Sequence, residues 1–339
     1  MKRIIASLFL SAALTGAAPP AAAPTPQWPP APAKAHLRFV STIVGPRVAG
    51  TGRMGGFLRA LIGLEKSGEI SKNRLVKPTG LFVSSGTVFI ADLGMRAVLR
   101  YNEADGKGEW WPRSAEAKLL SPVSVAGSAD GRLFVLDSLL HKVFILDSAG
   151  KIAGELEGDP QGMGQPAAVV VLGRRVYVSD VKNHRIAIYG IDGGFIQSFG
   201  RRGLGNGEFN FPTYLWGDAS TGQLWVSDSG NFRVQWFDAD GRFIGKMGEN
   251  GNRPGYLARP RGIARDSEGH VYATDAAFDA FQIFEPTGQF LLFVGHAGSL
   301  PGEFSMPGGI HVDGRDRVYV ADTQNARVQV FQFLKEVQP

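Results

Sequence analysis

A short hairpin unit recurs six times along the chain, and it limits the possible fold more than any other feature. Its last copy is VYVADTQNARVQVF at 318–331, where two runs of β-branched and aromatic residues flank a polar turn. That composition predicts two antiparallel strands joined by a hairpin loop. The other five copies begin at Val88, Leu133, Val176, Leu224 and Val271.

Each hairpin belongs to a longer repeating unit of roughly 45 residues. Internal units continue with a third strand that begins Gly-x-Phe or Gly-Phe-Ile, as at Gly194, Gly241 and Gly288. A proline opens each unit, which suits the first residue of a strand because its missing N–H costs nothing there. Four short strands in such a period are typical of a β-propeller blade. The six prolines are Pro78, Pro122, Pro166, Pro212, Pro260 and Pro307.

The sixth unit ends at Phe333 without its outer strand, while residues 37–44 (LRFVSTIV) form a strand with no neighbour of its own. We predict that this N-terminal strand completes the last blade and closes the ring, which leaves no open sheet edge. The expected fold is therefore all-β: a six-bladed β-propeller of four-stranded antiparallel blades at 37–335. A β-solenoid is the alternative, but it would not need the first strand to complete the last repeat.

The repeated pattern Pro-x-Gly-aliphatic, Val-Tyr-Val-x-Asp, Asn-x-Arg-Val-x-Val-Phe and Gly-x-Phe resembles NHL repeats. The resemblance covers 37–334, and the fifth unit departs from it at 279–281. WD40 and kelch patterns fit less well, because Gly-His and Trp-Asp pairs are missing and double glycines hold no fixed position. The resemblance implies a propeller, a fold that serves binders, scaffolds, hydrolases and lyases alike.

The segments that precede the first blade predict export. Residues 1–17 read as a signal peptide with Lys2 and Arg3, an apolar run and small residues, and 18–36 read as a Pro/Ala-rich tether. With no cysteine for a lipid or disulfide, we expect a periplasmic or secreted protein without a transmembrane span in the mature chain.

Residues 45–77 form a longer connection whose apolar part, 57–64, predicts a short helix. It would pack on the rim or, alternatively, touch a partner or membrane.

An aspartate ends the second strand of every unit. A carboxylate at the start of a turn accepts backbone N–H groups and fixes the hairpin, so we assign these residues a structural role. A metal or acid/base site would need the carboxylates to converge, whereas one residue per blade is distributed around a ring. The six residues are Asp92, Asp137, Asp180, Asp228, Asp275 and Asp322.

Basic and amide side chains follow the aspartates in the same loops. Pairing of each arginine with its own aspartate is one interpretation. The other is a polar, positively charged rim on one face of the disc, joined by two residues at the blade entrances, that binds an acidic protein or an anionic glycan. The candidate rim residues are Arg96, His141, Lys142, Asn183, His184, Arg185, Asn231, Arg233, Asn325 and Arg327 from the loops, with Tyr214 and Arg261 at the entrances.

An enzyme is the main competing hypothesis. By resemblance, related six-bladed enzymes such as peptidylglycine amidating lyase and the calcium-dependent lactonases place His, Asn or acidic ligands near their inner strands. Here the second and fourth residues after the six prolines include no carboxylate and one imidazole, His311. Ca²⁺ takes six to eight oxygen ligands, which these positions do not supply. Ser124 has no evident base, so we assign no catalytic residue, cofactor or metal ligand.

Net charge argues against a nucleic-acid partner. Removal of Lys2 and Arg3 takes 36 basic residues to 34 against 31 acidic ones, so the mature charge is +3. We therefore expect an exported, non-catalytic protein-binding scaffold of the cell envelope whose partner is another envelope or secreted protein. The alternatives are a metal-dependent lyase or lactonase with a site at the channel mouth, and a binder of an anionic cell-surface glycan.

Overall fold

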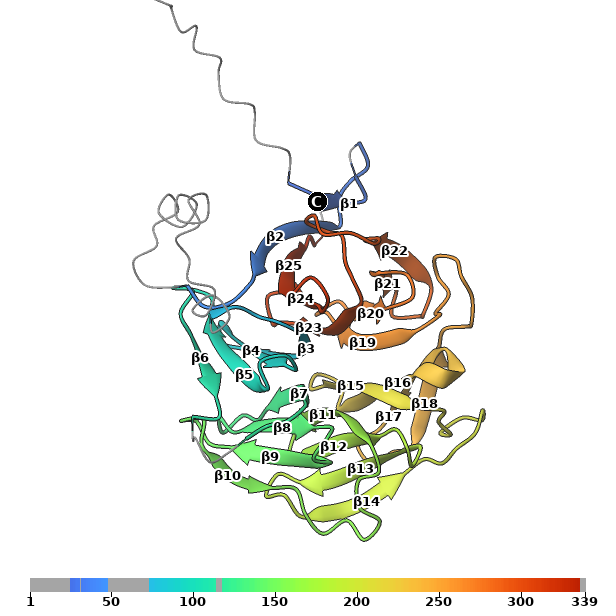
Figure 1. Cartoon of the computed structure of the whole chain (residues 1–339). Coiled ribbons are helices and arrows are strands. Elements are labelled where there is room, and N and C mark those ends of the chain that lie inside the picture. Colours follow the sequence, from blue (N-terminus) through green and yellow to red (C-terminus); the bar gives the residue numbers. More distant parts are fainter. Residues whose placement is uncertain (1–24, 31, 48–72, 114–117, 336–339) are drawn as a thin grey trace, which may run out of the picture.

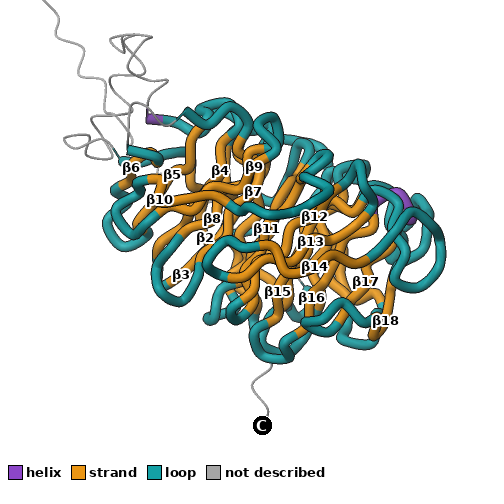
Figure 2. The backbone as a smooth tube through the Cα atoms, turned by 90° about the horizontal axis from the view of Figure 1, so that it is seen from below, coloured by secondary structure: helices purple, strands orange, loops and turns teal. Residues whose placement is uncertain are grey.

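Six antiparallel sheets stand around a central axis and form a disc. The computed structural model describes residues 25–30, 32–47, 73–113 and 118–335. The first strand of each blade lies nearest the axis, and the later strands lie progressively farther out (Figure 1). Seen from the side, the loops gather along the two faces of the disc (Figure 2). The predicted six-bladed propeller of four-stranded blades is confirmed.

The strands of the first three blades follow the predicted units. Blade 1 contains β3 (Pro78–Ser84), β4 (Thr87–Asp92), β5 (Ala97–Asn102) and β6 (Gly108–Trp111). Blade 2 contains β7 (Pro122–Gly127), β8 (Leu133–Asp137), β9 (Lys142–Leu146) and β10 (Ile152–Glu155). Blade 3 contains β11 (Pro166–Leu172), β12 (Arg175–Asp180), β13 (Arg185–Gly190) and β14 (Phe195–Phe199).

The other three blades repeat this arrangement. Blade 4 contains β15 (Pro212–Asp218), β16 (Gln223–Asp228), the short 3-10 helix η2 (Ser229–Asn231), β17 (Arg233–Phe237) and β18 (Phe243–Met247). Blade 5 contains β19 (Pro260–Arg265), β20 (Val271–Asp275), β21 (Ala280–Phe284) and β22 (Phe290–Val294). Blade 6 contains β23 (Pro307–Val312), β24 (Arg317–Asp322) and β25 (Arg327–Phe333), followed by β2 (Leu37–Ile43) and β1 (Gln27–Trp28) from the N-terminal side.

The N-terminal strand closes the ring as predicted. β2 pairs antiparallel with β25, with Leu37 opposite Phe333 and Ile43 opposite Val328. Part of the segment assigned to the tether also belongs to the propeller: β1 pairs with β2, and the Trp28 ring packs edge-to-face on Phe331 with centroids 5.6 Å apart. Gln27 and Trp28, within the segment expected to be a tether, therefore pack on the propeller.

Neighbouring blades pack because both faces of their strands are apolar. In β24, Val318 and Val320 join the core shared with blade 5, whereas Tyr319 and Ala321 join the core shared with blade 1. Alternate side chains of a strand point to opposite faces of its sheet, so a continuous apolar run serves both neighbours. All four residues are fully buried. Burial of this kind, repeated around the ring, stabilises the disc.

Hydroxyl groups link the blades at their inner edges. Thr323 Oγ1 donates to the carbonyl of Pro78 at 2.8 Å and thereby joins blade 6 to blade 1. Ser229 Oγ donates in the same way to the carbonyl of Pro260 at 2.6 Å. The inner strands also approach closely at Gly309, where a Cβ atom would lie 2.5 Å from the carbonyl oxygen of Thr79. The centre of the disc is consequently narrow.

Two predicted features fall outside the described residues: the signal peptide at 1–17 and the apolar stretch at 57–64. Within the described part of the chain, no helix has the length and apolar character needed to cross a membrane.

Candidate functional site

Strand register defines two chemically different faces of the disc. In blade 4, Pro212 at the start of β15 lies opposite Asp228 at the end of β16, and Asp228 lies opposite Arg233 at the start of β17. The loops that follow the aspartates therefore share one face with the connections between blades. We call this the Asp-loop face. The opposite face carries the loops between the first and second strands and between the third and fourth strands of each blade.

The six repeated aspartates lie inside the Asp-loop face and anchor the preceding connection. All six are fully buried. Asp137 accepts hydrogen bonds from the backbone N–H groups of Leu120 at 2.6 Å and Ser121 at 2.9 Å, just before the proline of its own blade. The carboxylates thus hold the start of each inner strand against the hairpin. In the other blades the N–H donors include Val76, Gly164, Asn210, Ala258 and Ser305.

Three arginines assigned to the rim are buried in ion pairs and do not form an exposed rim. Arg233 Nε lies 2.8 Å from Asp228 Oδ2, and the rest of its guanidinium donates to carbonyl groups of Leu204, Gly205 and Glu208. The connection between blades folds over the arginine with these carbonyls pointing inward. Arg327 repeats this arrangement with Asp322, whereas Arg185 pairs mainly with Asp159 at 2.6 Å. Pairing with the aspartate of the same hairpin therefore describes Arg233 and Arg327, whereas Arg185 lies 3.5 Å from Asp180.

The polar atoms of most other rim candidates form hydrogen bonds or ion pairs within the protein. The amide groups of Asn183, Asn231 and Asn325 each donate to the aspartate three positions earlier. Lys142 pairs with Glu155, and His184 Nδ1 accepts the backbone N–H of Phe211 at 3.2 Å. Arg96 and His141 are exposed, Arg261 is partly buried, and Tyr214 lies in the central channel. Arg96 and Arg261 are the arginine candidates that have no ion-pair partner among the described residues.

Exposed apolar side chains lie mainly on the Asp-loop face. Ten large hydrophobic residues are exposed in the described part of the chain, and seven of them lie in Asp-loop-face segments. The remaining three, Val40, Ile196 and Ile244, lie on outer strands, so none lies in a loop of the opposite face. Sequence reasoning missed these residues, which come from several blades around the ring. They are Val44, Val76, Leu139, Leu204, Phe211, Tyr256 and Leu300.

Charge is divided between the faces in the same way. On the opposite face, ion pairs join Arg132 with Asp130, Arg175 with Asp240, and Arg317 with Asp313 and Glu103. On the Asp-loop face, several exposed basic side chains have no ion-pair partner among the described residues. They outnumber the exposed carboxylates of this face that also lack an ion-pair partner in the described chain, which are Glu157 and Glu249. These basic residues are Arg96, Lys182, Arg202, Arg253 and Arg259.

The blade entrance in blade 5 adds to this charge. Arg261 is partly buried beside Arg259 and makes no hydrogen bond or ion pair with the described residues. Burial and the charge of Arg259 both lower the pKa of Arg261 from its usual value. Since a guanidinium group has five N–H donors, this pair favours an anionic group near the centre of the Asp-loop face.

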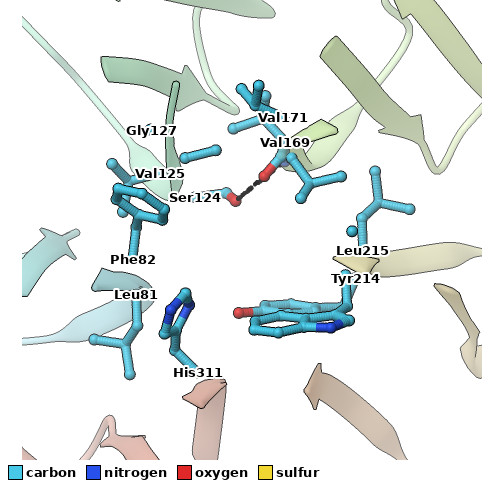
Figure 3. Close-up of a pocket in the computed structure, with 14 residues that line it drawn as sticks. Leu81, Phe82, Ser124, Val125, Gly127, Val169, Val171, Tyr214, Leu215 and His311 are labelled. Atoms are coloured by element: carbon cyan, nitrogen blue, oxygen red, sulfur yellow. Dashed lines mark hydrogen bonds between the residues drawn. The ribbon is translucent and has the colours of Figure 1, made fainter. Parts of the chain in front are cut away.

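A pocket lies in the central channel between the inner strands (Figure 3). Phe82, Trp216 and His311 come from three different blades, and each stands four residues after the proline of its blade. The His311 ring lies 5.6 Å from Phe82 and 5.0 Å from Trp216, edge-to-face in both cases. Aliphatic residues and glycines complete the wall. They are Leu81, Val125, Ala126, Gly127, Val169, Val170, Val171, Leu215 and Gly217.

The polar groups of the pocket are few and mostly engaged. Burial lowers the pKa of His311 to about 4, so the imidazole is neutral at pH 7. Ser124 Oγ accepts the N–H of Val169 at 3.1 Å, and the Tyr214 hydroxyl donates to the carbonyl of Ile310 at 3.3 Å. No carboxylate lines the pocket, and nowhere in the described ranges do three His, Asp or Glu side chains gather to hold a metal ion. The described wall does not fit the ligand set of a calcium enzyme.

Comparison with known proteins supports the repeat type. Residues 304–331, in blade 6, match the family model of the NHL repeat. A search of curated protein sequences finds no match.

Similar solved structures share the fold at low sequence identity. Virginiamycin B lyase from Staphylococcus aureus is 15% identical, with 76% of this chain and 96% of that chain covered and a TM-score of 0.55. A gluconolactonase from Xanthomonas campestris is 16% identical, with 77% and 87% covered and a TM-score of 0.59. A chain of a nidogen/laminin complex is 19% identical, with 64% and 80% covered and a TM-score of 0.52. At these identities the likeness establishes the fold and not the activity.

Proposed function

Because the chain is a six-bladed β-propeller that carries NHL-repeat sequence, we propose that it is a non-catalytic, exported scaffold that binds another envelope or secreted protein through its Asp-loop face. The observation that carries this proposal is the asymmetry of the disc. The exposed loop hydrophobics lie on this face, as do the exposed basic residues identified above. They occupy several blades of one face, so a partner that binds them must cover much of that face.

The chemistry of the face defines the partner. Leu204 is 78% exposed and Leu300 is 65% exposed, so apolar side chains of a partner can bury them. Arg202, Arg253 and Arg259 border this surface without carboxylate partners of their own in the described chain. The partner is therefore a protein surface with apolar side chains flanked by carboxylates, which the positive field also steers toward the face.

The two alternatives have less support in the structure. An anionic glycan would use the basic residues but would leave the exposed leucines unburied. A metal-dependent lyase or lactonase would need ligands in the channel, where the described lining side chains are apolar apart from those of His311, Tyr214 and Ser124. The lyase and the gluconolactonase share the fold with this chain, but their low identity transfers no site residue.

Site-specific photocrosslinking in the cells that make the protein tests the proposal. A photoreactive amino acid at position 204 should give a discrete protein adduct, whereas the same group at position 148, an exposed position on the opposite face, should not. Replacement of Arg202 and Arg253 by glutamate should abolish the adduct. The matched control replaces Lys151 and Arg242, which lie on the opposite face, and should leave the adduct unchanged. Equal adducts from both faces would refute the assignment of the binding face.

A salt titration separates a protein partner from a glycan. The partner recovered from the adduct should bind purified propeller with an affinity that falls modestly between low and physiological salt, since buried apolar contacts are insensitive to screening. A glycan bound by charge alone should lose affinity steeply over the same range.

A further inference from the structure

We propose that the central pocket is a binding site for a small, uncharged molecule about the size of one aromatic ring that carries a hydroxyl or N–H donor, with His311 as the acceptor. The inference does not depend on the Asp-loop face. It follows from how the channel is closed, from the composition of its wall, and from the unused hydrogen-bonding capacity of the imidazole (Figure 3).

Tyr214 crosses the channel on the side of the pocket that is nearer the Asp-loop face. It is two residues after Pro212, near the Asp-loop end of β15, and its hydroxyl crosses the channel to the Ile310 carbonyl of blade 6. A Cβ atom at Gly309 would lie 2.9 Å from this hydroxyl oxygen, so a glycine there makes room for the crossing. The pocket residues that stand four and five positions after the prolines lie farther along the inner strands. A ligand therefore enters from the opposite face, which the proposed protein partner does not cover.

The size and the wall of the pocket limit the ligand. The cavity measures about 80 Å³, several times the roughly 10–15 Å³ that one buried water needs. The lining side chains are apolar apart from Ser124, Tyr214 and His311, although polar atoms account for nearly half of the accessible wall. Ligand pockets typically combine apolar surface with a few placed polar groups. The volume and the aromatic side chains suit a ligand with a single ring.

A charged ligand is disfavoured because the pocket removes water from charged groups, which is also why burial lowers the pKa of His311. None of the described residues that line the pocket is a lysine, arginine, aspartate or glutamate, so a charged ligand would meet no counterion from them. The imidazole is held in its neutral form by burial, although Asp313 acts in the opposite direction. A carboxylate or an ammonium group would meet the same desolvation cost.

The neutral imidazole determines which polar group the ligand needs. One ring nitrogen of a neutral histidine carries a proton and the other is an acceptor. The backbone of Val83 contributes to the pKa of the ring, but neither ring nitrogen forms a hydrogen bond of normal geometry with the described residues. In the neutral ring one nitrogen is therefore left to accept. A ligand hydroxyl or N–H group satisfies it, whereas an ether or a hydrocarbon does not.

Phenol and toluene are the probes, because they share a ring and differ in one hydrogen-bond donor. We expect phenol to bind the full chain with one-to-one stoichiometry and a Kd of about 1 mM or below in calorimetry or ligand-observed NMR. Toluene should bind about tenfold more weakly, which is the effect of one hydrogen bond. In His311→Phe, which keeps a ring of similar size, the preference for phenol should disappear while the protein melts cooperatively.

A blocking variant locates the binding. Val170→Phe places a ring in the pocket and should abolish phenol binding, whereas Val40→Phe on the outer strand β2 should leave it unchanged. If Val170→Phe does not fold, Ala126→Val fills the same wall with a smaller group. No phenol binding up to about 10 mM, binding that survives a folded blocking variant, or stronger binding of tetramethylammonium than of phenol would each overturn the proposal. None of these outcomes bears on the photocrosslinking test of the Asp-loop face.

Discussion

Asp228 and Arg233, five residues apart in blade 4, form an ion pair at 2.8 Å in which the aspartate is fully buried and the arginine nearly so. Burial raises the pKa of Asp228, and hydrogen bonds from Asn210 and Arg233 oppose this effect. The arginine also binds three carbonyl groups of the connection that precedes the blade. The pair therefore joins a hairpin to an inter-blade connection, and its role is structural.

Arg233→Leu should lower the free energy of unfolding by about 3–5 kcal/mol, because it leaves Asp228 buried without its partner. Chemical denaturation measures this loss. Arg201→Leu is the matched control, since Arg201 is 81% exposed in its pair with Glu208 and should contribute no more than about 1 kcal/mol. Equal small losses in the two variants would mean that the buried pair does not hold the connection.

Acidification should destabilise the protein through His311. Its pKa of about 4 in the folded protein is below the unfolded value near 6.5, so the unfolded state binds the proton first. The stability that depends on the neutral ring is complete above pH 6.5 and is lost as pH falls toward 4. The cost at pH 4.5 is about 2–3 kcal/mol. Between pH 7 and pH 4.5, the free energy of unfolding of the wild type in urea should therefore fall relative to that of His311→Phe. A difference between the two proteins that does not change with pH would contradict burial of the ring.

His270 should show the opposite pH dependence. Its Nδ1 lies 2.9 Å from Asp266 Oδ2, and this hydrogen bond, with the charges of Asp266, Glu285 and Glu268, raises the pKa of His270 above its usual value despite partial burial. The stabilisation is complete below pH 6.5 and is lost as pH rises through the folded pKa. Wild-type protein should therefore exceed His270→Asn in unfolding free energy by more at pH 5.5 than at pH 9. A difference that grows with pH would exclude the protonated pair.

The repeats made the fold predictable, since six prolines, six hairpins and a missing outer strand together require a closed ring. The path of the connections between blades was not predictable in the same way. Arg233 and Arg327 stand at positions where spacing alone allows either pairing or exposure, and what buries them is a set of backbone carbonyls more than twenty residues earlier. The amino-acid composition of a loop does not indicate in which direction its backbone carbonyl groups point.

The candidate site was predictable only in its general character. A positive face on the disc was expected from Arg96 and its counterparts, whereas the exposed basic residues without ion-pair partners in the described chain are mostly others: Lys182, Arg202, Arg253 and Arg259. Those residues occupy non-repeated positions, so the repeat pattern could not single them out. Tyr214 and His311 were placed on inner strands, but only three-dimensional geometry shows that one crosses the channel and the other lies between two aromatic rings.

Docking of Trp28 on the last blade gives a further prediction, because its ring lies directly over Gly302. A Cβ atom at Gly302 would lie 2.3 Å from Cζ2 of Trp28, and the backbone there has φ +85°. Gly86 has a similar φ of +76° with nothing within 4 Å of a built Cβ. Gly86→Ala should therefore cost only backbone strain of about 1–2 kcal/mol, and Gly302→Ala should cost more because it also displaces the tryptophan.

A double-mutant cycle isolates the contact between the tryptophan and the glycine. In a Trp28→Ala background, Gly302→Ala should cost no more than Gly86→Ala does, because the clash has been removed. Thermal or urea unfolding of the single and double variants measures the coupling, which we expect to be about 1–3 kcal/mol. Strictly additive effects would mean that residues 25–30 do not pack on the propeller in solution. They would then act as the plain tether that their proline-rich composition suggests, and blade 6 would be closed by β2 alone.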